Sequence, residues 1–387
     1  MKKLITFSIL AYLLFTINSN AENQISNENS KILKIGVLLP LSGEFQEIGE
    51  SFLNAIKLAL YDLSNNNITI YPKDSKGSSL GAYNASKEFE EAGIKIVIGP
   101  IFYESLERLN EINNITFISF TNKTKKIPNN TIAFGINIKS QVKILKKYFN
   151  KIELSKTLLL SPKTEFINQT KTIEESKLKL YRTFSYNISP KKITNEIEIL
   201  TKYHERKRDL ERRVKILEKS DLYKDEQELK DLEQKHTLGK VSFDSVLVVD
   251  FGERLKSVIT SFMFSDVTSN EVNFFTINQW FDETFFNESA LQNLYFPGIN
   301  LNNLKKFNKK YLNKFNKKPS SVSILAYDAL GLVYYCWVNN DFKFEKTQLY
   351  NKKGFKGLHA EFFIKENVSN QKLKIYKVSN KKFVKVF

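Results

Sequence analysis

The chain has 387 residues, which is more than one small hydrophobic core holds and suits two lobes. Its apolar content of 42% is typical of a globular protein and excludes wholesale disorder. A net charge of +17 would attract an anionic surface, but Lys, Asn, Ile and Phe are abundant together along the chain, which favours a general compositional bias. We find no nucleic-acid-binding module beside this charge, so we do not expect nucleic acid as a partner.

Residues 1–21 have the pattern of a secretory signal peptide. Lys2 and Lys3 precede an apolar run, 4–17, and the small residue Ala21 suits cleavage. The run is shorter than the roughly 20 residues that a membrane span needs, and no cysteine follows it to accept a lipid. We therefore expect an exported, periplasmic protein that does not span the membrane.

Strands and helices alternate from residue 31 to Gly135. The first strand, 34–39, is apolar and stops at Pro40, and a polar loop follows it. Apolar residues then recur near helical spacing at Ile48, Phe52, Ile56, Leu60 and Leu63. Further strands are predicted at 68–71, 94–98, 115–119 and 131–134, with helices at 80–91 and 103–112. This alternation predicts a parallel sheet with right-handed crossovers.

The same alternation restarts after Gly135 and predicts a second lobe of the same architecture. Its predicted helices are 139–149 and 253–263, and its predicted strands are 157–160, 181–186, 246–249 and 273–277. Two more helices follow, 304–315 and one that opens at Ser323 and reaches Trp337. The tail from Gly354 alternates apolar and polar residues and predicts hairpin-like strands with a turn at 379–380.

A charged segment, 194–236, interrupts the second lobe and contains almost no glycine or proline. Its apolar residues keep an approximate heptad stripe, which breaks at 220–221 and then resumes: Ile193, Ile197, Leu200, Leu210, Val214, Leu217, Leu222, Leu229 and Leu232. This pattern predicts an antiparallel helical hairpin inserted in the second lobe. The hairpin is either a solvated insertion or an arm that docks on a partner.

Sequence motifs for catalysis or metal binding are not found. There is no phosphate-binding glycine loop, no His-Glu-x-x-His pair and no Gly-x-Ser-x-Gly elbow. The three histidines are far apart in sequence, and the single cysteine, Cys336, lies on an apolar helix where a buried inert thiol is expected. We therefore expect a protein without catalytic activity, metal or other cofactor.

Loops that follow the predicted strands are the candidates for a ligand cleft, because in two-lobed α/β proteins such loops face one another. They offer hydroxyl groups, free backbone N–H groups and aromatic walls. Each of these residues has the alternative role of loop capping or packing between the lobes. The candidate cleft residues are Ser42, Gly43, Phe45, Tyr103, Ser105, Asn122, Thr124, Phe166, Asp250 and Trp280.

Short segments in the right order give the chain a resemblance to type I periplasmic binding proteins, the leucine/isoleucine/valine-binding group. The segments are 35–43, 98–100, 118–120 and 326–329. Within that group the chain looks most like the penicillin-binding protein activators, through 99–102, the hairpin before 243–246, 279–282 and 354–357. The resemblance covers nearly all of the chain after residue 30.

This resemblance implies an α/β fold of two Rossmann-like lobes with parallel sheets joined by three crossovers. Lobe 1 would comprise 31–135 with 295–339, and lobe 2 would comprise 136–294 with 340–387, including the 194–236 hairpin. Activators of this type stimulate a cell-wall synthase by protein contact. The solute-binding branch instead captures branched-chain or related amino acids for the permease of an ABC transporter.

The loop 100–105 departs from the amino-acid binders, which typically hold the ligand carboxylate there with small hydroxyl residues and free N–H groups. Pro100 removes an N–H donor, and Ile101 and Phe102 are bulky. Glu104 would repel a carboxylate if it faced the cleft, so only Ser105 fits the pattern. We therefore expect a regulator of a peptidoglycan synthase, with a solute receptor as the alternative.

Overall fold

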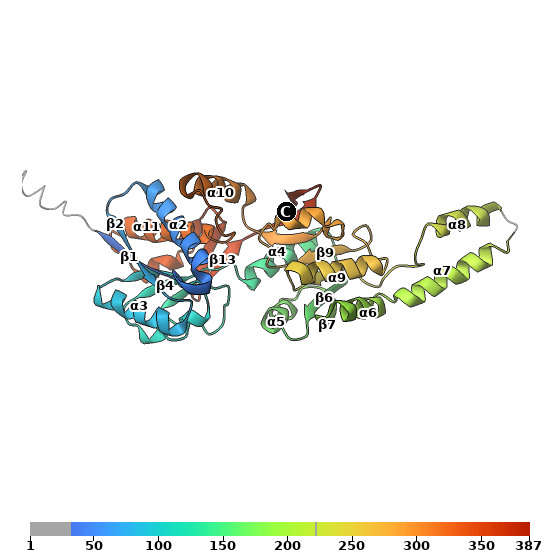
Figure 1. Ribbon diagram of the computed structural model, residues 1–387, viewed down its shortest axis with the longest axis horizontal. Helices are drawn as coiled ribbons and strands as arrows, with labels where there is room; N and C mark the ends of the chain where they lie inside the picture. The colour runs from blue at the N-terminus through green and yellow to red at the C-terminus, as the bar shows by residue number, and fades with distance from the viewer. Residues whose placement is uncertain (1–31, 221–222) are drawn as a thin grey trace, which may run out of the picture.

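Two α/β lobes lie side by side, and a helical arm projects from the second (Figure 1). The computed structural model describes residues 32–220 and 223–387, so the predicted signal peptide lies outside the described residues. Each lobe has a mixed, mostly parallel sheet covered by helices on both faces. The predicted fold class, two Rossmann-like lobes joined by three crossovers, is confirmed.

Lobe 1 is built on an eight-stranded sheet within the described residues, in the order β11-β12-β13-β5-β4-β3-β1-β2. Strands β1 to β5 pair in parallel, whereas β11 and β12 add antiparallel pairs at one edge. The strands are β1 (Leu33–Leu39), β2 (Ile68–Asp74), β3 (Ile96–Ile98), β4 (Thr116–Ser119), β5 (Thr131–Ala133), β11 (Phe355–Lys356), β12 (Glu361–Lys365) and β13 (Val368–Lys372). The helices of this lobe are α2 (Gln46–Leu63), α3 (Ser79–Glu91), α10 (Leu301–Phe315) and α11 (Ile324–Val338).

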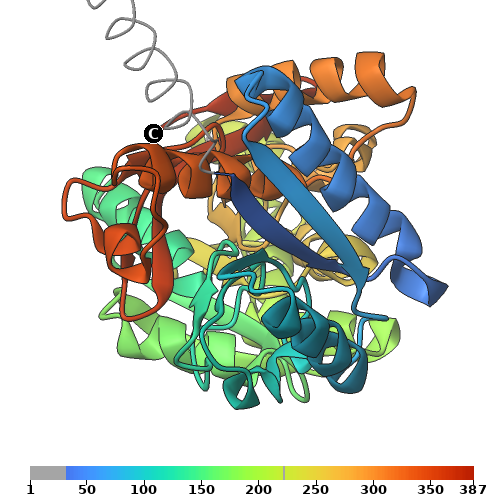
Figure 2. The same cartoon turned by 90° about the vertical axis from the view of Figure 1, so that its left-hand side faces the viewer.

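The first strand, β1, is buried on both faces, which explains its almost continuous apolar sequence. Val37 and Leu39 point into the core beneath α2 and α11, and Leu38 points to the opposite core beneath α3, where it joins Phe89. This alternation is the period of two that a strand imposes. Figure 2 shows the result, with the blue helix α2 on one side of β1 and β2 and the teal helix α3 on the other.

Lobe 2 is built on a seven-stranded sheet within the described residues, in the order β15-β14-β10-β9-β8-β6-β7. Val246 and Val248 of β8 point toward α6 and α9, and Leu247 points to the other face beneath α4 and α5. The strands are β6 (Thr157–Pro162), β7 (Leu180–Tyr186), β8 (Ser245–Val248), β9 (Asn273–Thr276), β10 (Tyr295–Gly298), β14 (Lys374–Ser379) and β15 (Lys382–Lys385). The helices are α4 (Ile138–Lys151), α5 (Ile167–Glu175), α6 (Pro190–Leu200) and α9 (Gly252–Phe264).

Sheet membership differs from the predicted lobe boundaries in two places. Strand β10, predicted for lobe 1, pairs in parallel with β9 and antiparallel with β14 in the lobe 2 sheet. Strands β11 to β13, predicted for lobe 2, belong to the lobe 1 sheet, where Val368 pairs with Ala133 of β5. Alternating apolar residues identify a strand, but they do not say which sheet receives it.

Hydrogen bonds between polar side chains and backbone groups hold the three crossovers. The Gln371 amide donates to the carbonyl oxygens of Phe134 and Gly135 at 3.2 and 3.0 Å, which ties the third crossover to the first. The Ser140 hydroxyl donates to Gln371 Oε1 at 2.8 Å. At the second crossover, the Asn300 N–H donates to the His359 carbonyl of lobe 1 at 2.8 Å. Backbone groups that leave the sheets here therefore have partners away from water.

The arm consists of α7 (Tyr203–Leu217) and α8 (Tyr223–Glu233), which pack along an apolar seam. The seam contains Leu210, Val214, Leu217, Leu229 and Leu232, as the heptad pattern predicts. The predicted start of the hairpin is wrong: residues 194–200 belong to α6, and Ile193 and Ile197 pack in the lobe 2 core. Of the predicted break at 220–221, residue 221 lies outside the described residues, as does Leu222.

One predicted helix is absent from its place, and the prediction for Cys336 is confirmed. The predicted helix 103–112 is two short 3-10 turns, Glu104–Leu106 and Leu109–Glu111. The Asn130 amide donates to the carbonyls of Leu109 and Ile112, which fixes the second turn in its tight form. Cys336 is a buried free thiol, as predicted, and burial raises its pKa to about 12.

Two helical glycines provide a matched test of the packing of α2 against β1. A Cβ on Gly49 of α2 would lie 1.8 Å from the backbone oxygen of Pro40, whereas a Cβ on Gly331 of α11 would meet no atom within 4 Å. Gly49→Ala should lower the free energy of unfolding by about 2 kcal/mol or more, because a backbone group must move. Gly331→Ala should raise it by up to about 1 kcal/mol. Urea denaturation measures both, and shifts of the same sign would contradict this packing.

Candidate functional site between the lobes

A pocket of about 370 Å³ lies between the two lobes. Of the ten predicted cleft residues, Tyr103, Asn122 and Thr124 line it together. The rest of its lining is polar or cationic apart from Ile138, and consists of Lys123, Lys125 and Lys126 of lobe 1 and Ile138, Asn168, Gln169, Thr172 and Asn278 of lobe 2. Amides, hydroxyls and ammonium groups around one cavity suit a hydrophilic, anionic ligand better than an aliphatic one.

The lobe 1 wall of this pocket is held by contacts within its own loop. The Tyr103 hydroxyl donates to the carbonyls of Lys125 and Lys126, each at 3.4 Å. The Lys123 ammonium lies 4.1 Å from the centroid of the Tyr103 ring and 3.4 Å from a carboxylate oxygen of Glu104. The Glu104 carboxylate therefore partly neutralises one of the three lysines that line the pocket.

The loop that follows β1 forms its hydrogen bonds within lobe 1. The Ser42 hydroxyl and the Leu41 N–H both donate to the carboxylate of Asp74. Burial opposes ionisation of Asp74, but these hydrogen bonds outweigh it and leave the pKa of the carboxyl below its ordinary value. Gly43 and Phe45 line a separate groove at the start of α2, and the Phe45 ring lies 4.6 Å from that of Phe102.

Three further predicted cleft residues lie apart from the pocket lining. Ser105 is fully buried, and within the described residues its hydroxyl has no hydrogen-bond partner. Phe166 precedes α5, and its ring meets the exposed ring of Phe251 edge-to-face at 5.7 Å. Trp280 follows β9 of lobe 2 but packs against the core of lobe 1, so it contributes to the contact between the lobes.

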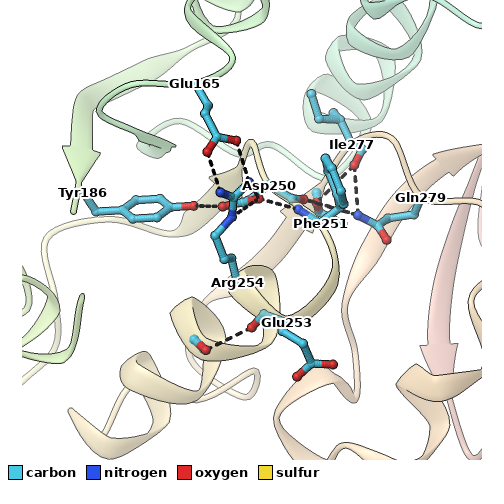
Figure 3. A network of polar contacts seen from close by, with 10 residues as sticks. Glu165, Tyr186, Asp250, Phe251, Glu253, Arg254, Ile277 and Gln279 are labelled. Atoms are coloured by element: carbon cyan, nitrogen blue, oxygen red, sulfur yellow. Dashed lines mark hydrogen bonds and ion pairs between the residues drawn. The ribbon is translucent and has the colours of Figure 1, made fainter. Parts of the chain in front are cut away.

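Asp250, the last predicted residue, is the centre of a closed polar network at the ends of the lobe 2 strands (Figure 3). Its buried carboxylate accepts hydrogen bonds from the Tyr186 hydroxyl at 2.5 Å, the Phe251 N–H at 2.8 Å and Nε of Arg254 at 3.2 Å. The Arg254 guanidinium in turn holds Glu165 through two bonds of 2.6 and 2.7 Å. The two carboxylates and the guanidinium thus satisfy one another within the protein.

The protonation of this network follows from its geometry. The hydrogen bond from Arg254 lowers the pKa of Glu165, and the bond to Glu165 raises the pKa of Arg254. Burial, together with the neighbouring Asp250 carboxylate, raises the pKa of the Tyr186 hydroxyl. Tyr186 is therefore a neutral donor and Arg254 a permanent cation. Asp250 is occupied by partners of its own chain rather than presented to a ligand.

Sequence reasoning missed Glu165, Tyr186 and Arg254. Arg254 follows Asp250 by four residues at the start of a predicted helix, which is the spacing of a helical ion pair and could have indicated the contact. The lysines of 123–126 lie in the same loop as the predicted cleft residues Asn122 and Thr124, and an isolated lysine in a loop gives no sequence signal of a pocket. Glu165 and Tyr186 come from other strand ends, so no local spacing relates them to Asp250.

Residues 32–220 and 223–387 contain no group of three or more His, Cys, Asp or Glu side chains placed to hold a metal ion. Among the helices of these same residues, none is both long enough and apolar enough to cross a bilayer.

Replacing Arg254 should destabilise the protein, because it leaves the buried Asp250 carboxylate without its cation. Arg254→Met should lower the free energy of unfolding by about 3 kcal/mol. The matched control is Arg208→Met, since Arg208 is an exposed arginine on the arm. This variant should change the free energy of unfolding by less than about 0.5 kcal/mol. Urea denaturation at neutral pH distinguishes the two, and equal effects would show that the network adds nothing to stability.

Glu165 gives a pH-dependent signature of the same network. Its pKa is lower in the folded protein than the ordinary value of 4.5, so its stabilising effect is complete above that value and is lost as the pH falls through the folded pKa. The difference in unfolding free energy between the wild type and Glu165→Gln should be constant between about pH 6 and 8 and shrink below 4.5. A pH-independent difference would contradict the ion pair.

Comparison with known proteins identifies the fold. No family model and no curated protein matches this sequence. Among solved structures, the C-domain of LpoA from Haemophilus influenzae, a regulator of PBP1A, matches with a TM-score of 0.61 and 14% identity over 92% of this chain and 100% of that one. Full-length LpoA matches over 59% of its own length, with a TM-score of 0.59 and 14% identity over 92% of this chain. A putative branched-chain amino acid ABC transporter protein from Rhodospirillum rubrum matches with a TM-score of 0.69 and 12% identity over 92% and 100% of the two chains. The chain therefore has the type I periplasmic binding-protein fold.

Proposed function

We propose that this is a non-catalytic periplasmic protein that regulates a peptidoglycan synthase, with the arm α7–α8 as the element that contacts the synthase. The observation that carries the proposal is a rigidly anchored, charged arm on a binding-protein fold whose lobe 2 strand ends are closed. The likeness to the LpoA C-domain, a regulator of PBP1A, supports the same class of partner.

Arg206 anchors the arm to lobe 2. It is buried, and its guanidinium donates to the Thr201 carbonyl at 3.0 Å, the Thr237 hydroxyl at 2.8 Å and the Ser265 carbonyl at 2.5 Å. The backbone oxygen of Arg206 accepts from the Leu238 N–H at 3.0 Å, so the two ends of the arm meet at this residue. A fixed base presents the arm in one orientation, which lowers the ordering cost of binding.

The two helices of the arm differ in charge. Helix α7 carries six Lys and Arg against three Asp and Glu, whereas α8 carries two against five. Arg213 of α7 holds Glu228 of α8 through two bonds of 2.8 and 2.7 Å. Ile216 of α7 is 54% exposed beside these charges. Charged groups around an apolar contact suit a specific protein interface.

The cleft supports the same function. Asp250, Glu165 and Arg254 satisfy one another, and Ser42 is held by Asp74. The groups that could bind the ammonium and carboxylate of a free amino acid at these positions are thus occupied. A regulator does not need them free, whereas an amino acid receptor does.

Removing the arm tests this function directly. Residues 207–235 should be replaced by a short Gly-Ser linker, since Arg206 and Leu238 already lie together and α6 must stay in the lobe 2 core. Pull-down of the synthase should be lost while the urea midpoint of the two lobes is kept. Unchanged pull-down would exclude the arm as the contact.

A point variant makes the test independent of the deletion. Ile216→Glu places a charge in the exposed surface of α7 and should weaken pull-down about tenfold or more. Leu80→Glu on α3 of lobe 1 is the matched control, since Leu80 is 60% exposed and lies away from the arm. Equal loss with both variants would argue against a specific arm contact.

The pocket between the lobes favours a second function, a solute receptor of an ABC transporter for an amino acid or related anion. Its lining from both lobes and its three lysines carry this alternative. Thermal-shift measurements with the common amino acids decide between the two, because a ligand at 100 times its Kd stabilises by about 2.7 kcal/mol. We expect no shift. A micromolar hit that Lys123→Gln with Lys125→Gln abolishes would make the receptor the main function.

A further inference from the structure

Two segments without acidic residues account for most of the net positive charge. Residues 301–318 contain seven lysines and residues 367–387 contain six, and neither segment has an Asp, a Glu or an Arg. Without these thirteen lysines, the 59 Lys and Arg of the chain become 46 against 42 Asp and Glu. The charge is therefore a local feature rather than only a compositional bias.

The fold brings the start of the first segment against the second. The first is α10 with the loop that follows it, and the second contains the strands β13, β14 and β15. Strand β10 pairs with β14 and leads directly into α10, and the Leu301 N–H at the start of α10 donates to the Tyr376 hydroxyl of β14 at 3.0 Å. Figures 1 and 2 both show α10 and the C-terminal end of the chain at the upper side of the molecule. We call the lysines of 301–318 and 367–387 the basic face.

Most lysines of the basic face are available to a partner. Leu304, Phe307 and Tyr311 bury one side of α10 in lobe 1, so its lysines are exposed on the other sides. Three of the thirteen form ion pairs with Asp62, Glu50 and Glu361. Among the described residues, the other ten make no ion pair; they are Lys305, Lys306, Lys309, Lys314, Lys318, Lys374, Lys377, Lys381, Lys382 and Lys385.

The side chains of the basic face suit a partner with many negative charges spread over a surface, rather than one small anion. Lysine is a point charge on a flexible stem, whereas recognition of a single phosphate or carboxylate commonly uses the planar fork of arginine. Two exposed apolar side chains, Leu312 of α10 and Val384 of β15, lie in the same segments, each 42% exposed. Apolar side chains among lysines strengthen binding to a lipid interface, where headgroups meet acyl chains. They add little to binding of a hydrophilic polyanion.

We propose that the basic face binds the surface of an anionic phospholipid bilayer. The lysines attract the anionic headgroups, and Leu312 and Val384 enter the headgroup layer. The arm α7–α8 belongs to lobe 2, away from α10 (Figure 1), so a protein bound to the bilayer keeps its arm accessible. This surface is independent of the synthase contact and of the pocket between the lobes.

Vesicle sedimentation tests the proposal with the chain purified after export, because an uncleaved signal peptide would itself bind lipid. The vesicles are phosphatidylcholine alone or with roughly one third phosphatidylglycerol. Binding should occur only to the anionic vesicles and should weaken steeply as salt rises, since screening removes long-range attraction. Equal binding to both vesicles, or to neither, would overturn the proposal.

Matched variants show whether the basic face or the overall charge is responsible. Replacing Lys305, Lys306, Lys309 and Lys314 by Gln should weaken binding about tenfold or more, and so should replacing Lys381, Lys382 and Lys385. The control replaces the same number of exposed lysines in lobe 2 and the arm by Gln: Lys191, Lys192, Lys207 and Lys215. It should change binding by less than about twofold. Equal losses in the control would overturn the proposal, and unchanged urea midpoints verify that each variant is folded.

A final variant separates lipid from a soluble polyanion. Leu312→Ser with Val384→Ser removes no charge and should weaken vesicle binding roughly threefold or more, because the apolar tips no longer enter the headgroup layer. Binding to heparin, the soluble probe, should be unchanged. If the double variant leaves vesicle binding unaltered, or if DNA or heparin binds through the basic face while anionic vesicles do not, the bilayer is the wrong partner.

Discussion

The chain passes between its two lobes three times, and this constraint determines most of what the structure does. Each passage takes backbone out of a sheet and through a buried region, where its polar groups need partners. Gln371 supplies them for the first and third passages, and the His359 carbonyl accepts from Asn300 at the second. With these passages in place, β10, β14 and β15 belong to the sheet of lobe 2, and β11 to β13 belong to the sheet of lobe 1.

The same topology separates the Asp250 network, the pocket between the lobes, the arm and the basic face. The lobe 2 strand ends converge on Asp250, where Arg254 and Glu165 close them with an internal ion-pair network. The pocket that remains between the lobes is lined by polar and cationic groups. The arm leaves lobe 2 from a base held by Arg206, and the basic face lies over α10 and the C-terminal strands.

Local pattern predicted the elements well because their signals are local. Short, almost continuous apolar runs marked β1 and β8 as buried strands, and the heptad stripe from Leu210 onward marked α7 and α8. The pattern failed where two elements share one stripe: Ile193 and Ile197 continue the heptad in sequence but pack in the lobe 2 core as part of α6. A stripe shows that a face is buried, and it does not name what covers that face.

The sequence by itself determined the two-lobed α/β class, the order of the elements, the helical hairpin and the buried character of Cys336, because periodicity and composition act over a few residues. Only the tertiary structure decided which sheet received β10 and which received β11 to β13. It also decided that Asp250 meets Tyr186 and Arg254, that Arg254 holds Glu165, and that two lysine-rich segments some fifty residues apart meet where α10 begins. These contacts join residues distant in sequence, and their partners are chosen by the path of the chain through three crossovers.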